Sequence, residues 1–346
     1  MKMTFRWYGE KDSIAIEKIA QIPTMQGVVS AVYDVPVGDV WGEESIRAIK
    51  DQAESHGLTF EVVESVPVHE DIKLKANNYD ELIENYCENI RRLAKYGVKV
   101  ICYNFMPVFD WLRSTMECPL QDGSHSLAYV DDEVLAMNPL TSELSLPGWD
   151  ESYSKPELRA LLNRYAEVDD EKLWENLKYF LDKIIPVCEE LDVKMAIHPD
   201  DPPWGIFGLP RIITNKENLV KFLNLNDSVY NGVTFCTGSY GASQSNDLID
   251  MIGAAKGRIH FAHVRNVKYT GAKDFQETAH PTECGSLDIY GIIKALIEGG
   301  FEGYIRPDHG RMIWGETGKY GYGLFDRALG ATYLSGLIEA IRKENA

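Results

Sequence analysis

Short apolar runs alternate with long amphipathic segments along the whole chain, and this alternation limits the available folds more than any other feature. The runs lack a clean two-residue alternation, which is typical of parallel strands buried on both faces. Eight such runs are expected as strands: Thr4–Tyr8, Gly27–Tyr33, Thr59–Ser65, Val98–Asn104, Lys194–His198, Gly232–Cys236, Arg258–Val264 and Gly303–Arg306. Because each is paired with a helical segment, the sequence predicts an α/β fold, a (β/α)8 TIM barrel.

The helical segments show a spacing of apolar residues near 3.6, and several are followed by a glycine. They are expected at Ser13–Gln21, Glu43–His56, Tyr79–Tyr96, Asp170–Leu191, Asn215–Leu223, Asp247–Lys256, Leu287–Glu298 and Phe325–Arg342. A doubly wound nucleotide-binding fold is the main alternative. No GxGxxG motif follows a strand run, so the sequence favours the barrel.

The chain has 346 residues, whereas such a barrel typically needs about 250. We expect a single barrel domain over residues 1–346, with most of the surplus in one insertion after the fourth strand. Residues 107–168 hold five of the 15 prolines and show no sustained periodicity. This segment is predicted to cover the C-terminal rim of the barrel, with short helices of its own.

Composition excludes several classes of partner. The 35 basic and 53 acidic side chains give a net charge of −18, which repels phosphate backbones and anionic lipids. We therefore expect no nucleic-acid partner and no membrane association. The charged start MKMTFRWYGEKD predicts no secretory signal, and six cysteines without a CxxC pair are typical of a reducing compartment. A cytoplasmic location is the expectation.

Potential metal ligands end four consecutive predicted strands. His198, Cys236 and His263 end the fifth, sixth and seventh, and Asp308 ends the eighth. In barrels of this kind the active site lies at the C-terminal ends of the strands. A single histidine or cysteine there is more often structural, but four ligand types on neighbouring strands predict a metal site. These donors suit Zn²⁺, Fe²⁺ or Mn²⁺, and the sequence does not choose among them.

Other histidines and acidic residues near these strand ends receive a structural interpretation. Asp200 and Asp201 are interpreted as solvated loop carboxylates, with orientation of the His198 ring as the alternative. His260 lies three positions before His263 and should face the opposite side of its strand. For His280, in the loop after the seventh strand, the sequence leaves a position near the site open.

Three arginines near strand ends are candidates for binding an anionic substrate. Arg6 and Arg306 lie on the first and last strands, which become neighbours when the barrel closes, and Arg265 follows the seventh strand. The alternative for each is an ion pair with one of the abundant carboxylates. A divalent cation would also attract an anion locally in this acidic protein.

Several motifs together resemble the mannonate dehydratase family. They are FRWYG, DGSHSLAYV, IHPDDPP, TFCTGS, and RPDHG followed by GYG, and the resemblance extends over essentially the whole chain. It implies a xylose-isomerase-like TIM barrel that dehydrates D-mannonate to 2-dehydro-3-deoxy-D-gluconate in hexuronate breakdown, using Mn²⁺ or Fe²⁺. One departure is Phe5, where relatives often have Trp.

The resemblance also implies roles for individual residues. The metal ligands of the family fall on His198, Cys236, His263 and Asp308. Its catalytic histidine falls on His309. Its catalytic tyrosine falls on Tyr322, with Tyr320 two residues away as the alternative.

Dehydration requires loss of the C2 proton and protonation of the leaving C3 hydroxyl. The residues His309 and Tyr322 suit these two steps, and the sequence does not assign which is acid and which is base. Two other functions stay open, namely a metal-dependent sugar isomerase or epimerase on the same barrel and a sugar-acid-binding protein without activity. A homodimer is expected, because barrels with long rim insertions often pair.

Overall fold

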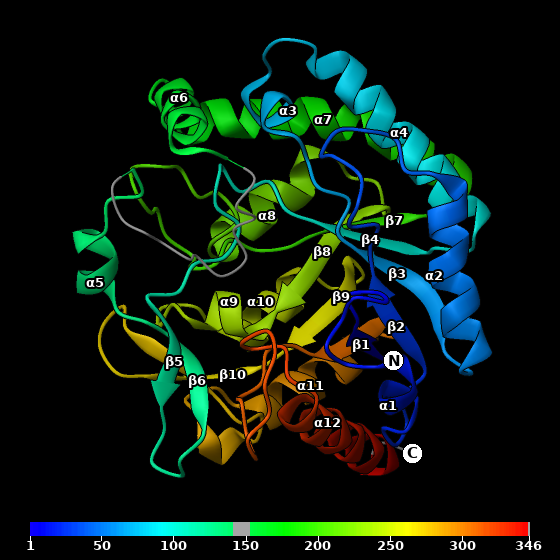
Figure 1. Cartoon of the computed structure of the whole chain (residues 1–346), viewed down its shortest axis with the longest axis vertical. Coiled ribbons are helices and arrows are strands. Elements are labelled where there is room, and N and C mark those ends of the chain that lie inside the picture. Colours follow the sequence, from blue (N-terminus) through cyan, green and yellow to red (C-terminus); the bar gives the residue numbers. More distant parts are fainter. Residues whose placement is uncertain (141–152, 345–346) are drawn as a thin grey trace.

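The computed structural model describes residues 1–140 and 153–344. Within these ranges a parallel barrel closes in the order β1-β12-β9-β8-β7-β4-β3-β2 (Figure 1). Its strands are β1 (Lys2–Arg6), β2 (Gly27–Ser30), β3 (Thr59–Glu64), β4 (Val100–Tyr103), β7 (Lys194–Ile197), β8 (Asn231–Cys236), β9 (Ile259–Val264) and β12 (Tyr304–Pro307). Each lies at one of the expected runs, and β1 pairs with β12 as expected. The predicted (β/α)8 barrel is confirmed.

The inside of the barrel is filled by apolar side chains from several strands. They are Val29, Val62, Val100, Cys102, Ala196 and Phe261, all nearly or fully buried. Successive side chains of a strand point to opposite faces, so the alternate residues pack outward against the helices. A larger core between barrel and helices results, which is the usual layering of this fold.

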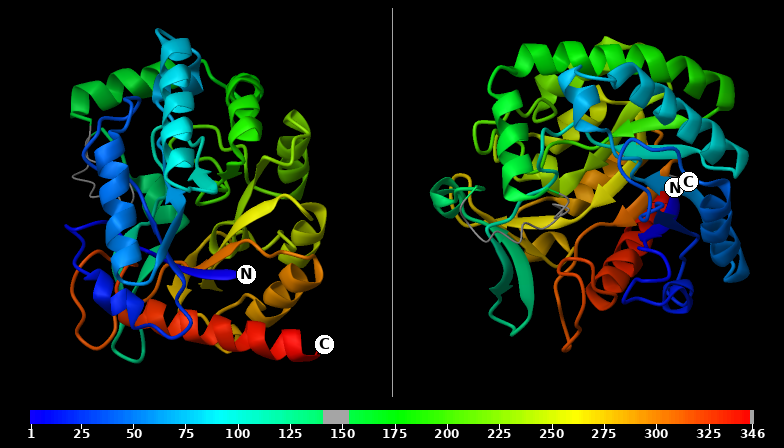
Figure 2. Two further views of the ribbon diagram at one scale, coloured as in Figure 1. Left: turned by 90° about the vertical axis from the view of Figure 1, so that its right-hand side faces the viewer. Right: turned by 45° about the horizontal axis from the view of Figure 1, so that its top comes forward.

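The helices surround the barrel (Figures 1 and 2). Those at the expected segments are α1 (Ile16–Ala20), α2 (Glu43–Ser55), α4 (Tyr79–Lys95), α7 (Asp170–Leu191), α8 (Lys216–Leu225), α10 (Leu248–Ala254), α11 (Ile289–Glu298) and α12 (Phe325–Glu344). Short helical turns are added at α3 (Glu70–Leu74), α9 (Thr237–Gly241) and η1 (Thr282–Cys284). In the described ranges, no helix combines the length and the apolar composition that a membrane span requires.

A second sheet was not predicted from the sequence. Its four strands, in the order β10-β11-β6-β5, are β10 (Asn266–Tyr269), β11 (Phe275–Thr278), β6 (His125–Tyr129) and β5 (Thr115–Pro119). Figures 1 and 2 show the β5–β6 hairpin beside the barrel. Its β6 pairs antiparallel with β11, and the rings of Tyr129 and Phe275 stack with centroids 5.6 Å apart. The sheet therefore joins the segment after β4 to the segment after β9.

The chain between β4 and α7 contains β5, β6, α5 (Asp131–Ala136) and α6 (Lys155–Tyr165). Helix α6 begins with a capping box, in which the Ser154 backbone N–H and the Glu157 carboxylate are 2.8 Å apart. Part of the predicted insertion, residues 141–152, lies outside the described residues.

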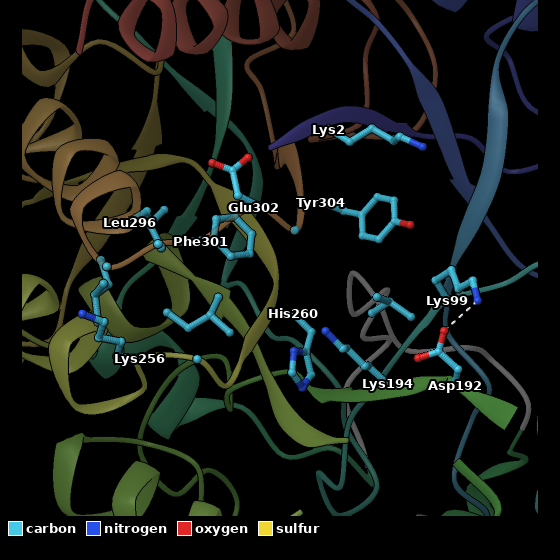
Figure 3. A pocket seen from close by; sticks show the side chains of 17 residues that line it. Lys2, Lys99, Asp192, Lys194, Lys256, His260, Leu296, Phe301, Glu302 and Tyr304 are labelled. Atoms are coloured by element: carbon cyan, nitrogen blue, oxygen red, sulfur yellow. Dashed lines mark hydrogen bonds and ion pairs between the residues drawn. The ribbon is translucent and has the colours of Figure 1, made fainter. Parts of the chain in front are cut away.

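The N-terminal end of the barrel contains a cavity of about 470 Å³ (Figure 3). Its charged lining includes four lysines, Lys2, Lys99, Lys194 and Lys256. His260 also lines it and is buried, and its Nε2 has no hydrogen-bond partner among the described residues. Burial, followed by the charges of Lys194 and Arg258, lowers the pKa of His260 to about 3. His260 is therefore a neutral structural residue away from the strand ends that carry the predicted ligands.

Candidate active site

A second cavity, of about 170 Å³, lies at the C-terminal ends of the barrel strands. Arg6 lines it from β1, Glu64 from β3, and Arg306 from β12. The residues His198, Asp308 and His309 come from the loops that directly follow β7 and β12, and Trp111 from the segment after β4. Lys319 and Tyr322 complete one side from the loop before α12. The barrel geometry thus brings polar groups from distant parts of the chain to one point.

Three of the predicted metal ligands lie together beside this cavity. One ligand atom each from His198, Cys236 and His263 can be chosen so that all lie within 4.8 Å of one another. The His198 Nδ1 is 2.7 Å from the carbonyl oxygen of Pro199, which leaves Nε2 for a ligand bond. His263 is fully buried, and its Nε2 lies 3.3 Å from Glu64 Oε2. These donors fit a divalent transition metal.

The fourth predicted ligand, Asp308, contacts two of these three residues. Its Oδ2 is 3.4 Å from Cys236 Sγ, and its Oδ1 is 3.9 Å from His263 Nδ1. The carboxylate also pairs with Arg306 Nη1 and Arg265 Nε, each at 2.8 Å. Burial opposes ionisation, but Arg306 and the neighbouring positive groups hold the pKa of Asp308 well below its usual value. The carboxylate is therefore charged and available as a ligand.

A second group of potential ligands, Glu64, Cys102 and His263, shares one histidine with the first. Burial, then the nearby Glu64 carboxylate, raises the pKa of Cys102 well above its usual value, so this thiol holds its proton. The sulfur of Cys236 instead lies close to His198 and His263 and accepts hydrogen bonds from the Ser239 backbone N–H and hydroxyl. The first group is therefore the better metal site.

His309 and Tyr322 form a contact pair at the same cavity. The distance from His309 Nε2 to the Tyr322 hydroxyl is 3.1 Å. Burial raises the pKa of Tyr322 well above its usual value, so the hydroxyl keeps its proton at neutral pH. Tyr320 does not line the cavity and instead hydrogen-bonds Glu117. Of the two tyrosines considered from the sequence, the structure places Tyr322 against His309.

Close approach of two loops makes this pair. The Gly310 backbone N–H donates to the Gly321 carbonyl at 2.9 Å. Gly321 has a φ of +79°, and a Cβ there would lie 2.7 Å from Leu127 Cδ1 and 3.5 Å from His309 Cγ. Glycine at this position therefore lets the Tyr322 loop pack directly on His309.

The three candidate arginines have different surroundings. Arg6 is buried and lines the cavity, and its Nε and Nη1 have no hydrogen-bond partner in the described residues. Arg306 lines the cavity too, but its guanidinium pairs with Glu64 and Asp308. Arg265 does not line the cavity and pairs with three carboxylates. Only Arg6 of the three keeps donors directed to neither a carboxylate nor a carbonyl.

Comparison with known proteins places this geometry in a family. The family model described as D-mannonate dehydratase (UxuA) matches residues 1–346. The chain belongs to this family. The mannonate dehydratase of Streptococcus uberis is 56% identical over 345 residues, which cover 99% of each chain. The crystal structure of mannonate dehydratase from Streptococcus suis serotype 2 superimposes with a TM-score of 0.94 at 50% identity, covering 100% of this chain and 96% of that one.

More distant structures share the fold of this mannonate dehydratase family member. A D-tagatose 3-epimerase-like protein superimposes with a TM-score of 0.60 over the full length of both chains, but at 13% identity. At that identity only the barrel architecture is shared. The isomerase or epimerase alternative considered from the sequence is therefore not favoured, and the chain is a hydro-lyase.

The interpretation of Asp200 and Asp201 as solvated loop carboxylates is wrong. Their exposed fractions are 2% and 1%. Asp201 pairs with Arg113 at 2.8 Å and with Arg265 at 2.6 Å, while Asp200 accepts from the Ile213 backbone N–H at 2.8 Å. These arginines are remote in sequence, so the local pattern around the two aspartates did not reveal them. The described contacts also do not include a hydrogen bond from the His198 ring to either carboxylate.

His280, whose place the sequence left open, is buried but does not line the cavity. It packs over Gly330, where a Cβ would lie 2.5 Å from its ring. This places the side chain against α12 rather than at the site.

Some residues at the site were missed from the sequence. Lys319 lines the cavity, with its Nζ 4.2 Å from the centre of the Tyr8 ring. The Trp111 ring lies 4.8 Å from the His309 ring. Glu277 contacts His309 from β11, outside the barrel. None follows a barrel strand of the expected pattern, and one glutamate among 53 acidic residues carries no signal.

Proposed function

We propose that this protein catalyses the dehydration of D-mannonate to 2-dehydro-3-deoxy-D-gluconate and water, a step in hexuronate catabolism. The observation that carries the proposal is one cavity that joins a cluster of metal-ligand side chains to the His309–Tyr322 pair in a member of the mannonate dehydratase family. The substrate is thus a small sugar acid, which needs both charge stabilisation and proton transfer.

For the metal, we assign His198, Cys236, His263 and Asp308 as ligands of Mn²⁺ or Fe²⁺. A divalent ion bound there would hold oxygen atoms of the sugar acid and stabilise the negative charge that develops when the C2 proton leaves. Arg306 and Arg265 support this assignment, because they hold the Asp308 carboxylate from two sides. Their own charges then serve the ligand set more than the substrate.

For proton transfer, we assign His309 as the base that takes the C2 proton and Tyr322 as the acid that protonates the leaving C3 hydroxyl. Tyr322 holds its proton because burial raises its pKa, and a poor leaving group needs such a donor. The hydroxyl of Tyr322 and Nε2 of His309 are 3.1 Å apart. This distance also lets the proton taken by His309 return to Tyr322 after water has left.

For the substrate carboxylate, we assign Arg6 together with Lys319. The unpartnered donors of Arg6 are buried at the cavity, where an anion would satisfy them. Burial opposes ionisation of Tyr8, but the charges of Arg6 and Lys319 lower its pKa below the usual value, which reflects a positive potential on this side of the cavity. This local positive potential explains how a protein with a net charge of −18 can attract an anion.

We further propose that residues 107–168 are an insertion that covers the rim. Asp110 and Trp111 line the cavity from this segment, and Arg113 pairs with Asp201 of the barrel loop. A cytoplasmic location is proposed because the cysteines Cys87, Cys102, Cys118, Cys188, Cys236 and Cys284 are all free. A homodimer is proposed for the assembled enzyme.

The test is metal analysis followed by assay. Purified protein should contain a divalent metal, chelation should abolish formation of 2-keto acid from D-mannonate, and Mn²⁺ or Fe²⁺ should restore it. An isomerase or epimerase would form no 2-keto acid, and a binding protein would bind mannonate without turnover. Either result, or full activity after thorough demetallation, would overturn the proposal.

A further inference from the structure

A carboxylate from outside the barrel holds the far side of the His309 ring. Glu277 lies on β11, in the sheet that was not predicted, and is 2% exposed. Its Oε1 and Oε2 are 2.9 and 3.0 Å from His309 Nδ1. The opposite ring nitrogen, Nε2, is the one that faces Tyr322. Nδ1 is thus held by Glu277, and Nε2 faces Tyr322 at the cavity.

We propose that Glu277 is a positioning residue for His309, accepting the hydrogen bond from Nδ1–H so that the lone pair of Nε2 is presented to the substrate. A neutral imidazole carries one proton, and an acceptor at one nitrogen places that proton there. A base needs the lone pair at the nitrogen that faces the reacting proton. This inference rests on the proposed function, because it names what keeps the proposed base competent.

Two arginines fix the Glu277 carboxylate in turn. Arg113 donates to Oε1 from Nε at 3.0 Å and from Nη2 at 2.7 Å, and Arg265 Nη1 donates to the same atom at 2.6 Å. All these arginine bonds go to Oε1, and among the described contacts the hydrogen-bond partner of Oε2 is His309. Although burial would raise it, the contacts of the carboxylate with His309, Arg265 and Arg113 lower the pKa of Glu277 to about 2. The group is therefore an acceptor at neutral pH.

This asymmetry makes Glu277→Gln a sharp test. The amide has only one acceptor oxygen, and the cationic donors at Oε1 require it there. The amide nitrogen then takes the place of Oε2, 3.0 Å from Nδ1, where it donates instead of accepts. The oxygen at the Oε1 position stays 2.9 Å from Nδ1, but it carries no full negative charge and is shared with three arginine donors. The substitution therefore weakens the preference for the ring form with its proton on Nδ1, the form that can act as a base. The substitution changes few atoms and leaves the volume almost unchanged.

Asp201 supplies a matched control in the same ion-pair network. It is equally buried and pairs with the same two arginines, Arg113 and Arg265. It has no hydrogen bond to His309 among the described contacts. Asp201→Asn therefore removes the same charge from the same network without changing the acceptor at Nδ1.

The experiment measures kcat, KM for D-mannonate, bound Mn²⁺ and the melting temperature of both variants. We expect Glu277→Gln to lower kcat by about 10²- to 10⁴-fold, the range for loss of a positioned base, with KM within about threefold of the wild type and metal retained. Asp201→Asn should lower the melting temperature by a similar amount but reduce kcat at least tenfold less than Glu277→Gln does.

Equal losses of kcat in the two variants, or a Glu277→Gln enzyme within threefold of the wild-type kcat, would overturn the inference. If Glu277→Gln does not fold or loses its metal, Glu277→Asp decides, because it keeps the charge and an acceptor. A Glu277→Asp enzyme with at least one tenth of the wild-type kcat supports the inference, and a larger loss with metal retained overturns it. Failure of the proposed function would appear earlier, as wild-type protein that forms no 2-keto acid.

Discussion

The two ends of the barrel both contain a cavity, and the larger one is at the end without the ligand cluster. The N-terminal cavity measures about 470 Å³ and the C-terminal one about 170 Å³. Strand β9 contributes a histidine to each end of the molecule, His260 toward the N-terminal cavity and His263 to the metal-ligand cluster. The two histidines share a residue type and a strand, so their different roles come from their surroundings.

Those surroundings differ in how charges are held. At the N-terminal end Lys99, Lys194 and Lys256 are exposed, and exposed charges are solvated and screened. At the C-terminal end the charges of Arg306, Asp308 and Glu277 are buried and fixed by several partners. The candidate active site therefore lies where charged groups are desolvated and held in a fixed arrangement, and the size of a cavity does not indicate its position.

The largest expected effects test the C-terminal end. Asp308→Ala should remove bound metal and activity together, because a buried ligand is lost. His309→Asn should retain metal and substrate affinity but lose about 10²- to 10⁴-fold in kcat, the usual contribution of general acid–base catalysis. Metal content and the rate of 2-keto acid formation in both variants check this. If His309→Asn loses its metal as Asp308→Ala does, or stays nearly fully active, the two roles are wrongly assigned.

A smaller effect distinguishes the two ligand groups that share His263. Cys236→Ala should weaken metal binding at least tenfold. The fold should survive, since Cys236 lies at the rim of the barrel. Cys102→Ala is the matched control, because it removes another buried thiol of the barrel interior. Titration of each apoprotein with Mn²⁺ measures the difference. Weaker metal binding in Cys102→Ala than in Cys236→Ala would show that the metal binds at the group of Glu64, Cys102 and His263 instead.

The smallest effect concerns the N-terminal end and is expected in stability alone. The pKa of His260 is about 3 in the fold and about 6.5 when unfolded. As the pH falls below 6.5 the unfolded chain takes up the proton and the folded one does not, so stability present above pH 6.5 is lost toward pH 3. Between pH 7 and pH 5 this loss is about 2 kcal/mol.

His260→Gln should remove that part of the pH dependence without changing metal content. Urea unfolding at the two pH values measures it, with His125→Gln as the control at an exposed histidine. An unchanged difference between pH 7 and pH 5 in His260→Gln would show that His260 is not the group responsible.

The barrel was predictable because each of its strands and helices has a local pattern of apolar residues that indicates its type. Asp170–Leu191, for example, was predicted with the bounds that the structure has, from an apolar face that includes Leu173, Leu177 and Phe180. The strand ends then placed His198, Cys236 and His263 together, because parallel strands align their ends. The position of Tyr322 against His309 needed the structure, since two tyrosines in one loop look alike in sequence.

The parts not predicted depend on contacts between remote segments. Strands β6 and β11 are short, and their pairing is visible only once both are folded. The ion pairs of Asp201 have the same origin, because Arg113 and Arg265 come from either side of it in the chain. Local periodicity describes which face of an element is buried, but not which distant charge will meet it there.

The pairing of β6 with β11 also has a consequence for the order of folding. The two strands belong to segments that follow β4 and β9, and these segments lie near each other only once the barrel strands are paired. We expect the barrel to form first and this sheet to dock on it afterwards. Since Glu277 and Arg113 arrive with the sheet and its flanking residues, refolding chains should regain helical content before they regain turnover, and a newly made chain would become an enzyme only at its last step.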